Sequence, residues 1–147
     1  MVDRHARDIA VDVLRQFMEG SISNREYERK YPRSNGDLAL REIWIQVWFF
    51  YSDVTTHTLS GKHALNAECR TFVERCILFL NEDAEFEWPR QKFRPWYGIV
   101  RLLGCGRTLE RRDEDEMNIG DKEVWPFQKR AQFEQMARRG FPGGPHS

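Results

Sequence analysis

The most apolar stretch of the chain is Ile43–Tyr51, where Gln46 is the only position that is neither aliphatic nor aromatic. A helix over these residues would be apolar on every side, and such a helix has to be buried. Asp37 is a suitable N-cap for it, because its side chain can accept hydrogen bonds from the first free backbone amides. We therefore predict a buried central helix that begins after Asp37 and continues to Tyr51.

Two longer amphipathic helices are predicted from apolar residues spaced three and four apart. The first covers residues 3–19 and is followed by Gly20, where a helix C-cap belongs. Its apolar stripe consists of Ile9, Val13, Leu14, Phe17 and Met18. The second begins at Asn66 and ends near Asn81. Its stripe consists of Cys69, Phe72, Val73, Cys76, Ile77 and Leu80.

A short helix is predicted between these elements, because Ser23 and Glu26 have the spacing of a capping box. It should stop by Tyr31, ahead of Pro32, since the residue before a proline avoids helical angles. The segment 52–65 lacks periodicity and is expected to be a connecting loop.

Proline and glycine also punctuate the last third of the chain. Pro95 is expected to open a short helix, and Lys122–Trp125 is expected to be extended because it precedes a proline. Pro126 then suits the first turn of a last helix, which would include Phe127 and end at Gly140.

Alternating apolar and polar residues, the pattern of a strand, are not convincing anywhere in the sequence. We predict an all-α protein, a single-domain bundle of about five helices around the buried central helix. Residues 1–140 would form this domain, and 141–147 would be a flexible tail.

Charge and cysteine content narrow the function classes. Basic and acidic residues balance at 23 each, so no overall field attracts the protein to nucleic acid or to an anionic membrane. The three cysteines, an odd number without close pairs, favour a reducing compartment. The charged start of the chain is unlike a signal peptide, and no apolar run approaches the roughly 18 residues of a membrane span. We expect a cytoplasmic protein.

Candidate catalytic and metal-binding groups are few. Asp53, His57 and His63 could supply three metal ligands, but their spacing and the threonines between them favour a loop that makes its own hydrogen bonds. Cys69 and Cys76 lie on an apolar stripe and are expected to be core residues, whereas Cys105 has arginines nearby but no identifiable base. We assign no catalytic, cofactor-binding or metal-binding residue. Whether the protein is an enzyme stays open, and the sequence favours a non-enzymatic protein.

A near-repeat in the sequence is the candidate protein interface. Glu85–Pro89 and Glu123–Phe127 both place an acid, aromatic residues and a proline at an expected helix entrance. Tryptophan is enriched at binding hot spots, so two exposed corners could bind another protein. The alternative is that each tryptophan packs where the chain turns. The candidate interface residues are Trp88, Pro89, Trp125, Pro126 and Phe127.

A basic segment offers an alternative function. Between Arg90 and Arg112 there are seven basic residues against one acid, with aromatic residues among them, as in proteins that bind polyanions. Acidic clusters on both sides of the segment can neutralise it within the same molecule.

The phrases Ile77–Leu80 followed by Glu87–Pro89, and Gly120–Phe127, resemble those of small uncharacterised bacterial proteins. The resemblance implies a bacterial cytosolic origin, and it assigns a catalytic role to no residue of this chain. Our leading hypothesis is a non-enzymatic protein that binds another protein or itself, as a regulator, an immunity-type inhibitor or an oligomer subunit, without cofactor or membrane partner. The alternative is a small enzyme, or a nucleic-acid or anion binder that uses the segment from Arg90 to Arg112.

Overall fold

The computed structural model describes residues 1–34, 36–88 and 120–139, and over these residues the fold is all-α. Five α-helices are described: α1 (Arg4–Met18), α2 (Asn24–Lys30), α3 (Leu38–Trp48), α4 (Ala67–Leu80) and α7 (Arg130–Arg138). Two short 3₁₀ turns, η1 (Gly61–His63) and η4 (Lys122–Val124), lie between them. Within the same residues no strand forms, and Ser23 and Thr58 make an isolated bridge. The helix expected at Pro95, Gly140 and the tail 141–147 lie outside the described residues.

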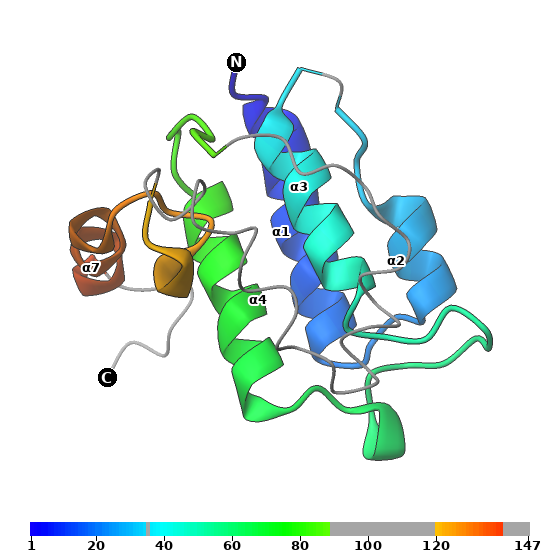
Figure 1. Cartoon of the computed structure of the whole chain (residues 1–147). Coiled ribbons are helices and arrows are strands. Elements are labelled where there is room, and N and C mark those ends of the chain that lie inside the picture. The colour runs from blue at the N-terminus through cyan, green and yellow to red at the C-terminus, as the bar shows by residue number, and fades with distance from the viewer. Residues whose placement is uncertain (35, 89–119, 140–147) are drawn as a thin grey trace, which may run out of the picture.

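Helix α1 is the element that joins the others. It contacts α2, α3 and α4, and α3 also contacts α4 (Figure 1). Asp3 caps its first turn by accepting from the backbone N–H of Ala6 at 3.0 Å. At its other end Gly20 has a left-handed φ of 75°, and the amides of Gly20 and Ser21 bond back to Phe17 and Gln16. This is a Schellman ending, which glycine adopts without steric cost.

The helix boundaries of α2 and α4 agree with the sequence analysis. Ser23 and Glu26 form the expected capping box, and Asn66 caps α4 through the backbone N–H of Cys69 at 2.7 Å. Tyr27, at the centre of α2, is fully buried, and its ring stacks on that of Phe17 with 4.4 Å between centroids. Aromatic stacking therefore fixes the short α2 against α1.

Helix α3 differs from the prediction in its length. Asp37 caps it as expected, but the helix ends at Trp48, and Phe49, Phe50 and Tyr51 follow it in a turn. Ile43, Ile45 and Val47 are buried, whereas Trp44 and Trp48 are only partly so. The apolar run contained no signal for this ending, because aromatic residues can be buried equally well in a helix or in a turn. That α3 is the centre of the bundle stays a prediction.

A buried ion pair joins the start of α1 to the start of α3. Arg7 is completely buried, and its Nε and Nη2 donate to the two carboxylate oxygens of Asp37 at 2.6 and 3.1 Å. Its Nη1 donates to the carbonyl oxygens of Glu82 and Ala84, just after α4. One side chain therefore ties three parts of the chain together, and we call this set of contacts the Arg7 junction.

The segment 120–139 differs from the extended stretch and the long helix that the sequence predicted. Lys122–Val124 forms the turn η4, because Asp121 caps it through the N–H of Glu123 at 3.0 Å. Pro126 follows a cis peptide bond, and α7 begins only at Arg130, so Phe127 precedes the helix. Each described helix is too short or too polar to cross a bilayer.

Candidate functional site

The structure buries four of the five predicted interface residues. Trp88 and Trp125 are each 7% exposed, Phe127 is 1% exposed, and Pro126 is buried with them. Pro89 lies outside the described residues. For these four residues, the structure therefore agrees with the alternative interpretation, in which the rings pack where the chain turns.

Their contacts explain why they are buried. Trp125 stacks on Phe72 of α4 with 5.2 Å between ring centroids, and Trp88 Nε1 donates to the carbonyl oxygen of Phe127 at 3.2 Å. Gly120 approaches Trp88 so closely that an added Cβ would lie 2.7 Å from the indole ring. A partner could reach these rings only if the segment 120–139 moved away from α4.

The two histidines of the loop 52–65 lie against each other. The rings of His57 and His63 stack with 4.1 Å between centroids, and His57 Nδ1 bonds to the carbonyl oxygen of Thr55 at 2.9 Å. Partial burial and the nearby His57 and Lys62 lower the pKa of His63. Over the described residues, no group of three histidine, cysteine or carboxylate side chains could hold a metal ion.

A buried asparagine, which sequence analysis did not single out, holds this loop. Asn24 Nδ2 donates to the carbonyl oxygens of Ser52 and Thr55 at 3.1 and 3.0 Å, and its Oδ1 accepts from the N–H of His57 at 3.0 Å. A fully satisfied amide at a buried position fixes the backbone around it. The loop is therefore an anchored part of the fold.

Both cysteines that the structure describes, Cys69 and Cys76, lie on α4. Cys76 is fully buried, and burial raises the pKa of its thiol well above the usual range. Cys69 is half-buried near the start of α4. Cys105 and the basic segment from Arg90 to Arg112 lie outside the described residues.

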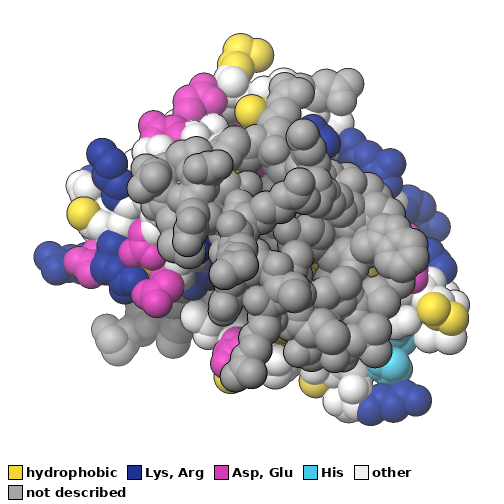
Figure 2. Space-filling model, viewed as in Figure 1, with side chains coloured by type: hydrophobic (Ala, Val, Ile, Leu, Met, Phe, Trp, Pro, Cys, Tyr) yellow, Lys and Arg dark blue, Asp and Glu magenta, His cyan; other side chains and the backbone are white. Residues whose placement is uncertain are grey.

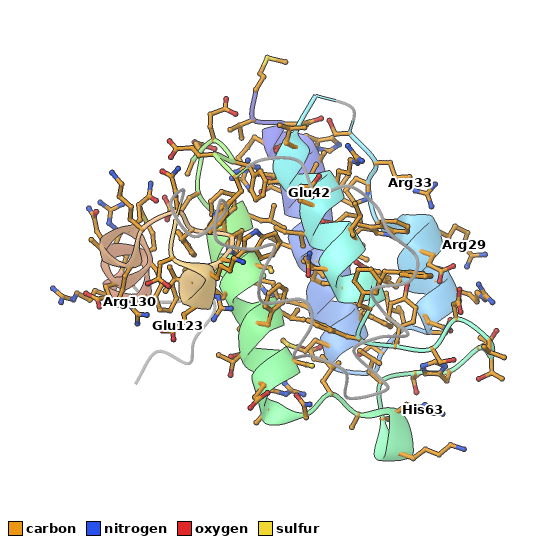
Figure 3. The ribbon with its side chains drawn as sticks, in the orientation of Figure 1. Arg29, Arg33, Glu42, His63, Glu123 and Arg130 are labelled. Atoms are coloured by element: carbon orange, nitrogen blue, oxygen red, sulfur yellow. The ribbon has the colours of Figure 1, made fainter. Side chains whose placement is uncertain are left out.

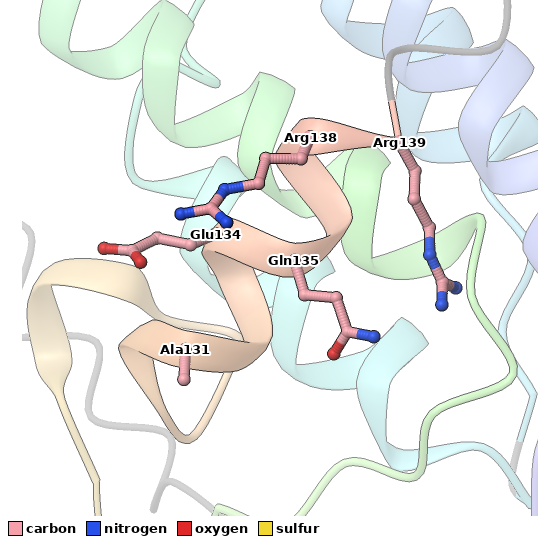
Figure 4. A pocket seen from close by; sticks show the side chains of 5 residues that line it. All are labelled: Ala131, Glu134, Gln135, Arg138 and Arg139. Atoms are coloured by element: carbon pink, nitrogen blue, oxygen red, sulfur yellow. The ribbon is translucent and has the colours of Figure 1, made fainter.

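A hollow of about 410 Å³ lies along α7 and is lined by Ala131, Glu134, Gln135, Arg138 and Arg139. Figure 4 shows that all five side chains come from α7 and the residue after it, and that Arg138 and Arg139 extend away from each other. Binding sites for small molecules usually gather a few polar groups from several elements around an apolar pocket. Among the described residues, the lining of this hollow comes from one helix and the residue after it, without such convergence.

An arginine side chain stacks on a tryptophan ring at the surface between α2 and α3. The guanidinium carbon of Arg33 lies 5.2 Å from the centre of the Trp44 ring, within the range of a cation–π interaction. Arg41 is one turn before Trp44 on α3, so both are on the same helix face. Arg29 is at the end of α2, and Figure 3 shows it extending outward on the same side as Arg33. We call Arg29, Arg33, Arg41 and Trp44 the arginine surface.

The three arginines of the arginine surface keep their positive charge without a carboxylate partner among the described residues. Arg29, Arg33 and Arg41 are exposed, and among the described residues none of the three forms an ion pair with a carboxylate. Trp44 is half-buried, and its Nε1 is a buried donor without an acceptor. Figure 2 shows Lys and Arg side chains gathered along the edge of the molecule where Figure 1 places α2.

Comparison with known proteins identifies no relative: no family model, no curated protein and no solved structure matches the chain. The chemistry of the arginine surface is therefore the basis for assigning a function.

Proposed function

We propose that this protein acts by binding another protein, and that the arginine surface is where it does so. The observation that carries the proposal is the stack of Arg33 on the half-buried Trp44, with Arg41 one turn earlier on α3. Tryptophan and arginine are the residues most enriched at binding hot spots, particularly where a ring is partly buried already and loses little freedom on binding.

The internal contacts of α2 support the same assignment. Tyr27 and Asn24 are both completely buried and hold the helix from inside. The outward side chain of Arg29 therefore projects from a backbone that is fixed before any partner arrives, and the guanidinium of Arg33 is held by Trp44. A preorganised surface loses less conformational entropy on association than a mobile one does.

The sequence hypotheses of a regulator, an immunity-type inhibitor or an oligomer subunit are all compatible with such a surface. The balanced formal charge, 23 basic against 23 acidic residues, favours selective pairing between surfaces over general attraction to a polyanion. The expected cytoplasmic location is part of this proposal, and a fluorescent fusion expressed in the source cells would check it.

The test compares the proteins captured from an extract of the source cells by three forms of the chain. These are the natural sequence, Arg33→Glu, and Arg138→Glu as a control on the exposed end of α7. We expect a defined protein that the natural sequence and Arg138→Glu both retain and Arg33→Glu loses. Retention of one identical set by all three forms, or of no protein above background, would contradict the proposal.

A further inference from the structure

The arginine surface also indicates the chemistry of the partner. We infer that it binds an acidic protein segment, one whose Asp and Glu carboxylates pair with Arg29, Arg33 and Arg41. This inference rests on the proposed function, since it specifies the partner for the same surface.

The first step is that the two acids of α2, Glu26 and Glu28, already have hydrogen-bond partners within the fold. Glu26 accepts from the backbone N–H of Ser23 at 2.9 Å and from its hydroxyl at 3.1 Å, and these bonds lower the pKa of Glu26. Glu28 accepts from the hydroxyl of Tyr51 and from Arg25, both at 3.2 Å. Both carboxylates are therefore engaged in holding α2 and the chain around it.

The second step is the net charge of the arginine surface once these two acids are counted. From Arg25 to Arg33, four basic side chains stand against these two occupied acids, and Arg41 adds a further positive charge from α3. Asp37 is buried against Arg7, and Glu42, which follows Arg41 in the sequence, is completely buried, so neither carboxylate reaches this surface. The surface therefore carries a net positive charge that the neighbouring side chains do not neutralise.

The third step is that the positive charges of the arginine surface are guanidinium groups. Guanidinium groups donate two parallel N–H groups to one carboxylate, and stacking on an aromatic ring holds the guanidinium plane in place. Arg33 is held in this way by Trp44.

The occupied acids also argue against a nucleic acid at this surface. A phosphate backbone prefers a continuous basic stripe, and Glu26 and Glu28 place negative charge between the basic residues of α2. A protein segment with separated carboxylates can avoid these two positions. The pattern therefore favours discrete ion pairs with a protein.

The direct test uses fluorescence anisotropy with two labelled probes at low salt, decaglutamate and a thymidine decanucleotide. We expect decaglutamate to bind, and the thymidine probe to bind about tenfold more weakly or not at all. Arg29→Glu/Arg41→Glu, which leaves the Arg33 stack in place, should weaken decaglutamate binding at least about tenfold. Arg138→Glu should leave it within about twofold. Circular dichroism of each variant confirms that it is folded.

Two results would overturn the inference: no binding of decaglutamate, or binding that Arg29→Glu/Arg41→Glu does not weaken. Tighter binding of the thymidine probe that the same variant abolishes would assign the surface to nucleic acid instead. The proposed function fails separately, when the extract experiment yields no protein that depends on Arg33. A captured partner together with no decaglutamate binding would retain the function and reject the acidic chemistry.

Discussion

Arg7 and Arg33 each lie over an aromatic ring, at 5.4 Å from the centre of Phe79 and 5.2 Å from the centre of Trp44, yet their surroundings are opposite. Arg7 is completely buried and pairs with the carboxylate of Asp37, while its remaining donors bond to backbone carbonyls. Arg33 is exposed and, among the described residues, has no carboxylate partner.

The comparison shows that a cation–π stack can have two different roles in one protein. At the Arg7 junction every strong interaction of the guanidinium is made within the fold, so the residue stabilises the fold and offers nothing to a partner. At the arginine surface the ring orients the guanidinium, but its hydrogen bonds are left to water. Changes at Arg7 should therefore affect stability, and changes at Arg33 should affect binding.

The largest effect is expected from Arg7→Met. This change leaves the Asp37 carboxylate buried without its cation, and such a loss costs about 3–5 kcal/mol. Urea unfolding followed by circular dichroism measures it. The control Arg7→Met/Asp37→Leu removes both charges and should recover part of the loss, because Asp37→Leu also removes the N-cap of α3. A single variant within about 1 kcal/mol of the natural protein would contradict the assigned role.

A smaller loss of stability is expected from Asn24→Ala, which tests whether Asn24 holds the loop 52–65 against α2. The change removes the bonds to Ser52, Thr55 and His57, and we expect a loss of about 1–3 kcal/mol. Hydrogen exchange at the His57 amide should become faster, while exchange in the middle of α4 should change only with global stability. Unchanged exchange at His57 would show that Asn24 does not hold the loop.

The two regions should also differ in their response to pH. Burial raises the pKa of Asp37, but the hydrogen bond from Arg7 and those from the backbone amides of Asp3 and Ala39 outweigh it and place the pKa below its usual value. A carboxyl whose pKa is lowered by folding stabilises the protein above its unfolded pKa of about 3.9, and loses that contribution as pH falls through the folded value.

Unfolding free energies measured from neutral pH to below about pH 4 should therefore fall less steeply in Arg7→Met/Asp37→Leu than in the natural sequence. Arg33→Ala should follow the natural profile, since no shifted carboxyl contacts Arg33. Equal slopes in the natural protein and the double variant would contradict the assignment of Asp37.

The smallest effects on stability are expected at the arginine surface itself. An exposed cation–π contact contributes about 0.5–1 kcal/mol, so Arg33→Ala should change the free energy of unfolding by no more than that. Arg33→Lys keeps the charge but loses the planar fork, and should weaken decaglutamate binding by less than Arg33→Glu does. A loss of several kcal/mol on Arg33→Ala, measured by urea unfolding, would make Arg33 a structural residue like Arg7.

Local signals account for the parts of the fold that the sequence predicted. The all-α class, the capping box at Ser23 and the glycine ending of α1 each depend on residues a few positions apart. The early end of α3 at Trp48 and the turn at Lys122–Val124 were missed. They depend on packing and on the Asp121 cap, which hydrophobic periodicity does not report.

The Arg7 junction and the arginine surface were missed for a different reason: both join residues far apart in sequence. Arg7 carried a partial signal, because it is three residues before Ala10 and seven before Leu14, on the buried side of α1. Ile9, which the sequence analysis placed on the apolar stripe, is instead 38% exposed. Nothing in the sequence indicated that Arg33, which precedes α3, would lie over Trp44, eleven positions later on that helix.

The most direct test of the central claim is a double-mutant cycle for decaglutamate affinity with Arg33→Ala, Trp44→Leu and the two combined. If the stack is the binding unit, either change alone removes most of its contribution. The double variant should then lose less than the sum of the single losses, with a coupling of about 0.5–3 kcal/mol. Strictly additive losses, or affinities equal to that of the natural protein, would show that Arg33 and Trp44 do not act together in binding.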